Sequence, residues 1–100
     1  MTARQITVVG AGVIGLTTAL ELAAAGHDVT VIAADPPAQT TSAIAGAIWF
    51  PYQVGPPARV TAWAARTRAR WHALVADRDA GVDLLTGYEL AATAEPPWWL

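Results

Sequence analysis

The sequence has 100 residues, 54% of them hydrophobic, with no cysteine and a formal net charge of −2. This length limits the chain to one small domain, and the lack of cysteine excludes disulfides and thiolate metal sites and fits a reducing compartment. The negative charge argues against nucleic acid as a partner, and no apolar run is long enough to span a bilayer. We therefore expect neither a nucleic-acid nor a membrane partner.

The first elements expected along the chain are a strand, a glycine turn and a helix. Residues 6–9 are apolar or β-branched, which suits a strand buried on both faces. They run directly into a Gly-x-Gly-x-x-Gly motif at residues 10–15. An alanine- and leucine-rich pattern predicts a helix over residues 13–25, which Gly26 would end in a left-handed conformation.

A second strand is expected over residues 29–33, where β-branched side chains again dominate. Asp35 and two prolines follow and stop the strand. A strand, a helix and a second strand in this order form one right-handed βαβ crossover. The sequence therefore predicts the α/β fold class, with a Rossmann-type βαβ dinucleotide-binding unit.

The remaining pattern is more varied. Residues 39–42 predict a polar loop, and residues 44–52 form an apolar run, either a buried strand or backbone that closely approaches a flat ring. A helix is expected over residues 59–76, with Trp63 and Trp71 on its core-facing stripe. Residues 82–90 predict a strand pair, or one strand bent at a glycine.

The glycine motif predicts a binding site for a nucleotide pyrophosphate. In this interpretation Gly10 makes the tight turn, Gly12 lets the pyrophosphate approach the backbone, and Gly15 allows the helix to pack closely on the strand. Asp35, twenty residues after Gly15, could accept a hydrogen bond from a ribose 2′-hydroxyl and would disfavour a 2′-phosphate. The alternative for Asp35 is an ordinary turn residue before proline.

The other polar candidates are less specific. Thr40, Thr41 and Ser42 could contact a diphosphate or a polyol, although their composition alone favours a solvated loop or a helix cap. His27 and His72 have no partner at metal or triad spacing. We therefore predict no metal site and identify no catalytic acid, base or nucleophile.

Several segments together resemble the opening of the D-amino-acid oxidase family. The glycine motif within residues 8–20 is shared by many flavoproteins, whereas the hydroxyl trio 40–42 followed by Ala-Ile-Trp-Phe-Pro-Tyr at 47–52 is more specific. Residues 86–90 and 97–98 extend the likeness over nearly the whole chain. It implies that residues 1–100 are the N-terminal part of the FAD-binding domain of a two-domain flavoprotein oxidase, whose substrate domain and remaining FAD-domain strands lie mostly outside them.

The resemblance implies FAD as the cofactor. The residues that it and the glycine motif assign to FAD are Gly10, Ala11, Gly12, Val13, Ile14, Gly15, Ala34, Asp35, Thr40, Thr41, Ser42, Ala47 and Ile48. Phe50 and Tyr52 would lie on the substrate side. The chain departs from many relatives at Ala47, where a glycine often follows the small residues, and at Phe50, where a polar residue is common.

The family oxidises D-amino acids to imino acids, which hydrolyse to keto acids and ammonia, and passes the electrons to molecular oxygen to give hydrogen peroxide. The resemblance thus implies an enzyme for neutral D-amino acids that is cytoplasmic, or peroxisomal in a eukaryote, with a homodimer left open. A D-aspartate, glycine or amine oxidase is the alternative within the superfamily. An NAD-binding dehydrogenase fragment and a non-catalytic module are alternatives of other classes. We expect the 100-residue piece alone to be inactive.

Overall fold

The computed structural model describes residues 2–51, 54–88, 90, 92–93 and 95. The chain divides into two compact units, Met1–Ala47 and Ile48–Leu100. Each unit has its own helix and its own small core, and each is described separately below.

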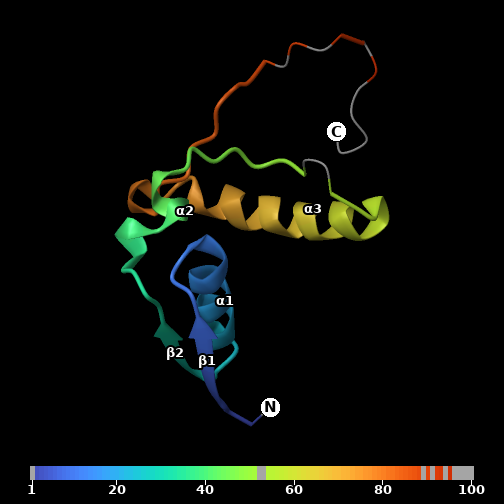
Figure 1. Cartoon of the computed structure of the whole chain (residues 1–100). Coiled ribbons are helices and arrows are strands. Elements are labelled where there is room, and N and C mark those ends of the chain that lie inside the picture. The colour runs from blue at the N-terminus through green and yellow to red at the C-terminus, as the bar shows by residue number, and fades with distance from the viewer. Residues whose placement is uncertain (1, 52–53, 89, 91, 94, 96–100) are drawn as a thin grey trace. The chain divides into compact units, whose positions relative to one another are not determined.

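The first unit contains the predicted strand, helix and strand. Strand β1 (Gln5–Val9) and strand β2 (Asp28–Ile32) lie side by side with α1 (Val13–Ala24) against them (Figure 1). The strands pair in parallel, in a register that runs from Gln5 opposite Asp28 to Val9 opposite Ile32. These elements confirm the α/β fold class, and their ends differ from the predicted ends by one residue.

Helix α1 ends as its sequence predicts. Gly26 adopts a φ of +87°, a left-handed conformation that costs glycine little. Its N–H donates to the carbonyl oxygen of Ala23 at 2.9 Å, and the N–H of His27 donates to that of Leu22 at 3.1 Å. This pair of bonds satisfies carbonyl groups that the end of a helix otherwise leaves without partners.

The prediction that the first strand is buried on both faces is wrong for this chain. Exposure alternates along β1, with Ile6 and Val8 half-buried and Val9 82% exposed. Within the first unit α1 packs on the two strands, and Gln5 and Thr7 on the other side of β1 are exposed. A parallel sheet is normally covered on both faces, so Val9 and the 56%-exposed Ile32 form an uncovered apolar surface.

The segment after β2 is more regular than a polar loop. A 3₁₀ turn, η1 (Pro37–Gln39), leads into a single helical turn, α2 (Thr41–Ile44). Residues 45–50 then have no regular secondary structure, and Ile48 is 85% exposed. The possibility of a buried strand at residues 44–52 is thus wrong for the part that the structure describes.

The second unit is built on α3 (Pro57–Leu74), which starts and ends two residues before the predicted bounds. Proline suits the first helical position because its missing N–H would have no helical partner there. Val60 is 5% exposed and Trp71 is half-buried, as expected for the core-facing stripe. Trp63, also predicted to be core, is 59% exposed because little of the described chain covers its end of the stripe.

The chain after α3 forms a tight turn and then no strand. Asp77 accepts a hydrogen bond from the N–H of Asp79 at 3.0 Å and so caps the 3₁₀ turn η2 (Arg78–Ala80), and Gly81 follows with a φ of +68°. The strand predicted over residues 82–90 is absent from residues 82–88 and 90, and Glu89 lies outside the described residues. A strand needs a neighbour to receive its backbone hydrogen bonds, and no described segment pairs with this one.

No helix in the described part of the chain is both long enough and apolar enough to cross a membrane.

Candidate functional site

The candidate site begins at the glycine turn between β1 and α1. Gly10 has a φ of +109°, and its N–H donates to the carbonyl oxygen of Ile32 at 2.8 Å, which extends the pairing of the strands by one residue. A Cβ on Gly15 would collide with the carbonyl oxygen of Gly10. Glycine is therefore required at both positions by the turn itself, because one needs a left-handed backbone and the other needs space.

Gly12 lies beside Ser42 in this structure. The hydroxyl oxygen of Ser42 accepts a hydrogen bond from the N–H of Val13 at 3.0 Å. A Cβ on Gly12 would stand only 3.0 Å from the same oxygen. The close approach that Gly12 permits in this structure is therefore that of Ser42, which brings α2 onto the start of α1.

The start of α1 keeps backbone donors for a ligand. Its first helical bond runs from the N–H of Leu16 to the carbonyl oxygen of Gly12, at 3.0 Å. The N–H groups of Ile14 and Gly15 precede this bond and so have no acceptor within the helix. The first turn carries no acidic side chain, so the positive end of the helix dipole is not neutralised there. These groups can bind an anion such as a diphosphate.

A hollow of about 440 Å³ lies beside this turn, at the carboxyl ends of the two strands. Ala11, Ala34 and Asp35 line it, so three of the predicted cofactor residues meet there. Leu16 and Val31 add apolar walls. One carboxylate among apolar side chains suits a ligand with a hydroxylated ring next to a flat apolar one, as in a nucleoside.

The hydroxyl trio separates into three different environments. The Thr40 hydroxyl donates to the carbonyl oxygen of Pro37 at 2.8 Å and so fixes η1. The Ser42 hydroxyl contacts the glycine turn. Thr41 is exposed at the start of α2, and no hydrogen bond of its hydroxyl to a described residue is recorded. Only Ser42 joins the turn directly.

The remaining predicted residues belong to both units, and each is described within its own unit. Ala47 ends the first unit, and Ile48 and Phe50 belong to the second. Ile48 is 85% and Phe50 39% exposed. Tyr52 lies outside the described residues. Within the described ranges, no three His, Asp or Glu side chains are grouped so that they could hold a metal ion.

Sequence reasoning missed two features of this site. The bond between Val13 and Ser42 joins residues 29 positions apart, and no local pattern indicates such a partner. Leu16 and Val31 were not singled out as walls of the hollow, although α1 begins and β2 ends beside the glycine turn. Their apolar character in the turn-facing part of α1 and at the end of β2 was the available signal.

These features define an α/β protein whose first unit carries a candidate anion-binding turn and a neighbouring hollow. The chain belongs to the family described as FAD dependent oxidoreductase (DAO), whose model matches residues 5–98. The resemblance to a FAD-dependent family that the sequence carries is thereby confirmed. No solved structure matches the chain significantly.

The relatives are named for the oxidation of D-amino acids. A D-amino-acid oxidase of Rubrobacter xylanophilus is 47% identical over 97 residues, which are 95% of this chain and 30% of that protein. A D-amino-acid oxidase of Streptomyces coelicolor is 43% identical over 84 residues, 83% of this chain and 26% of that protein. A D-amino acid dehydrogenase of Rhizobium rhizogenes is 54% identical over 50 residues, 48% of this chain and 12% of that protein. The chain thus spans less than a third of the length of these relatives.

Proposed function

We propose that the chain is the N-terminal part of a Rossmann-type FAD-binding domain in a D-amino-acid oxidase. The observation that carries this proposal is the hollow that joins Ala11 of the glycine turn to Ala34 and Asp35 after β2. The family is FAD-dependent, and the residues at this hollow fit the ADP half of that cofactor. Two oxidases match more than four-fifths of the chain, which supports the choice of reaction.

The glycine turn and α2 would hold the diphosphate. The N–H groups of Ile14 and Gly15 are free of helical partners and would donate to its oxygens. Ser42 already accepts from Val13, so its own hydroxyl hydrogen remains available to donate to a phosphate oxygen. Thr41, exposed on the same helical turn, would supply a further hydroxyl.

The hollow would take the adenosine. Asp35 would accept the ribose hydroxyl, and its negative charge would disfavour a nucleotide with a phosphate at that position. The methyl groups of Ala11 and Ala34 would leave room for the sugar, and Leu16 and Val31 would pack against the adenine. By family resemblance, Ala47 and Ile48 would lie against the flavin ring, with Phe50 and Tyr52 toward the substrate.

The bound flavin would supply the redox chemistry by accepting the hydride of the substrate α-carbon and passing both electrons to oxygen, with peroxide as product. The imino acid that forms would hydrolyse to a keto acid and ammonia. We propose neutral D-amino acids as substrates because Phe50 is apolar where relatives often carry a polar side chain. D-aspartate, glycine and simple amines are the substrates to compare.

A second candidate is a D-amino acid dehydrogenase, which would pass electrons to an acceptor other than oxygen. The 54% identity with the Rhizobium rhizogenes dehydrogenase over 50 residues favours it. That match covers only 48% of the chain, compared with 95% for the Rubrobacter xylanophilus oxidase. The oxidase is therefore the first choice.

A chimera tests the proposal. The matched 97-residue segment of the Rubrobacter xylanophilus oxidase is replaced by the corresponding segment of this chain, and the purified protein is examined for bound cofactor and for oxidation of D-alanine. We expect a yellow protein that contains FAD and produces peroxide. A folded chimera that is colourless and binds NAD would contradict the proposal, and one that reduces an artificial dye but not oxygen would favour the dehydrogenase.

A further inference from the structure

A second hollow lies within the second unit, against α3. Its volume is about 490 Å³, and it is formed by one face of the helix together with Trp49 and Pro51. Trp49 and Pro51 belong to the segment that covers this face of the helix. Pro51 is buried, whereas Trp49 is 37% exposed, so solvent reaches the hollow beside Trp49. All of its walls come from one compact unit.

The hollow combines apolar and basic side chains, which suits an anion that also has an apolar part. Three alanines of α3 form an apolar floor beside the Trp49 ring. Arg68 and His72 also line it, and they lie one helical turn apart on the same face. Helix α3 contains no acidic residue, so no carboxylate of its own helix pairs with Arg68.

Arg68 and His72 are exposed, and no hydrogen bond or ion pair to a described residue is recorded for either. A guanidinium presents two parallel N–H donors that match the two oxygens of a carboxylate. A phosphate is often held at a helix N-terminus, whereas Arg68 and His72 lie in the second half of α3. We therefore expect Arg68 and His72 to bind a carboxylate.

We propose that the hollow between α3 and Trp49–Pro51 binds a small monocarboxylate with a flat apolar body. Arg68 binds the carboxylate, His72 donates a second hydrogen bond, and the body lies on the alanine floor against the Trp49 ring. The volume is in the range of sites for small molecules. This inference does not depend on flavin binding, because none of these residues is assigned to the cofactor.

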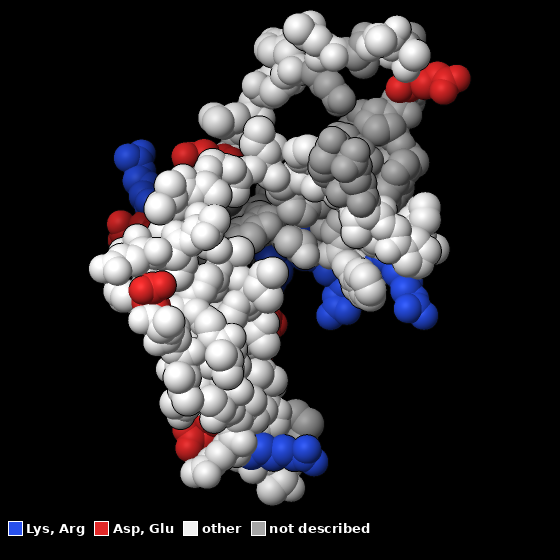
Figure 2. Space-filling model, in the orientation of Figure 1, with Lys and Arg blue, Asp and Glu red and all other residues white. Residues whose placement is uncertain are grey.

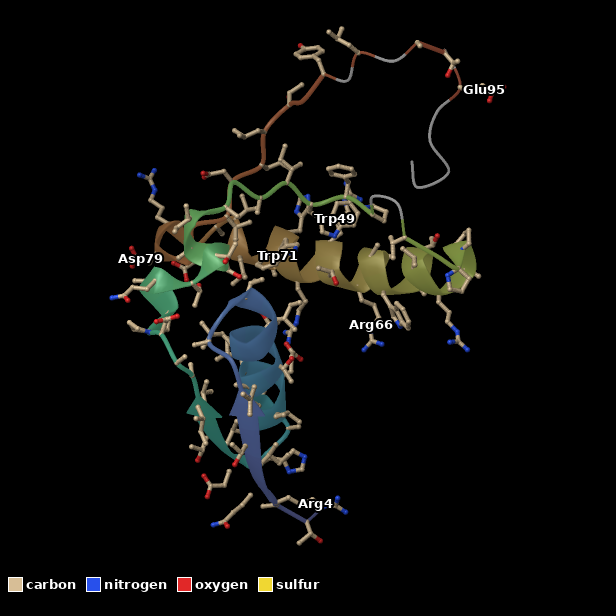
Figure 3. All side chains as sticks on the ribbon, viewed as in Figure 1. Arg4, Trp49, Arg66, Trp71, Asp79 and Glu95 are labelled. Carbon is tan, nitrogen blue, oxygen red and sulfur yellow. The ribbon has the colours of Figure 1, made fainter. Side chains whose placement is uncertain are left out.

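The same helix provides a matched control. Arg66 precedes Arg68 by two positions and lies about 160° away around the helix axis. Figure 3 shows Trp49 on one side of α3 and Arg66 projecting from the other. In Figure 2, which has the orientation of Figure 1, basic groups project along the lower edge of α3. A ligand attracted only by the charge of the helix would respond equally to both arginines.

The test is an NMR titration of the full chain with phenylacetate, observed at the indole N–H signal of Trp49, which a Trp49→Phe variant assigns. We expect a saturable shift with a Kd on the order of 1 mM. Arg68→Gln should raise this Kd about tenfold, because the charge-assisted hydrogen bonds to the carboxylate are lost. Arg68→Lys should fall between the two, and Arg66→Gln should leave the Kd nearly unchanged.

Phenylacetamide, which is neutral and nearly the same shape, and inorganic phosphate complete the titration. We expect neither to bind measurably. The proposal is overturned if phenylacetate gives no saturable shift, or if phenylacetamide or phosphate binds as tightly as phenylacetate does. It is also overturned if Arg66→Gln weakens phenylacetate binding as much as Arg68→Gln does. Preserved signals for the rest of α3 in each variant show that the helix is intact.

Discussion

The hydroxyl oxygen of Ser42 lies 3.0 Å from the backbone nitrogen of Val13 and accepts its hydrogen bond. Gly12, the residue before Val13, has no side chain of its own to cap α1, and Ser42 performs this role from 29 residues further along the chain. The bond therefore holds the glycine turn and α2 together, and it places a hydroxyl next to the free amides of α1.

Ser42→Ala should loosen the start of α1. The loss of a capping hydrogen bond costs about 1 kcal/mol, so the Val13 amide should exchange with solvent hydrogen about fivefold faster. Thr41→Ala is the matched control, because the neighbouring hydroxyl has no recorded hydrogen bond to a described residue. Equal exchange rates of Val13 in the two variants would show that Ser42 does not cap the helix.

Gly15→Ala should destabilise the first unit. The added Cβ would collide with the backbone carbonyl of Gly10, which cannot rotate away as a flexible side chain could. We expect a loss of about 2 kcal/mol in the free energy of unfolding, measured by urea denaturation. Gly46→Ala should change it by less than about 0.5 kcal/mol, since its Cβ would meet no atom within 4 Å. Similar losses in both variants would contradict the packing role of Gly15.

Asp35→Ala should weaken the binding of ADP. Loss of one hydrogen bond from a ribose hydroxyl to an exposed carboxylate should raise the Kd about fivefold. Asp28→Ala is the control, because Asp28 is an exposed aspartate at the start of β2, whereas Asp35 follows the end of that strand. Isothermal titration of the purified chain measures both. A fivefold effect at Asp28 as well would indicate a general loss of structure or charge, and no effect at Asp35 would remove it from the site.

Residues 1–100 alone should retain FAD poorly. Val9 of β1 is 82% exposed and Ile14 of α1 is 81% exposed. The strand and the helix that flank the glycine turn therefore have few packing contacts to hold them in place. Desalting of the chain after incubation with FAD should therefore remove nearly all of the flavin absorbance. Retention of one FAD per chain through this step would show that the first unit suffices for tight binding.

The first unit could be predicted from sequence because its signals are local. The glycine motif predicted the turn, and Gly26 predicted the end of α1 together with its left-handed backbone. Asp35 was expected at the cofactor because it lies twenty residues after Gly15, a spacing at which an acidic residue can bind the ribose of a dinucleotide. The hollow that Ala11 and Asp35 share has the arrangement that this spacing implies.

The errors concern features that depend on distant partners. Residues 82–88 have a strand-like composition, but a strand forms only where another segment receives its hydrogen bonds. Trp63 lies on the apolar stripe of α3 and is still 59% exposed, because burial depends on what covers the helix. The bond from Val13 to Ser42 also needed the tertiary structure, since each residue alone has many other uses.

The most direct test of the central claim is the product of D-alanine oxidation by the chimera that carries this chain in the Rubrobacter xylanophilus oxidase. The account predicts a protein with the visible spectrum of bound flavin that releases one hydrogen peroxide for each keto acid formed. A folded chimera with no flavin spectrum, or one that forms keto acid without consuming oxygen, would contradict it.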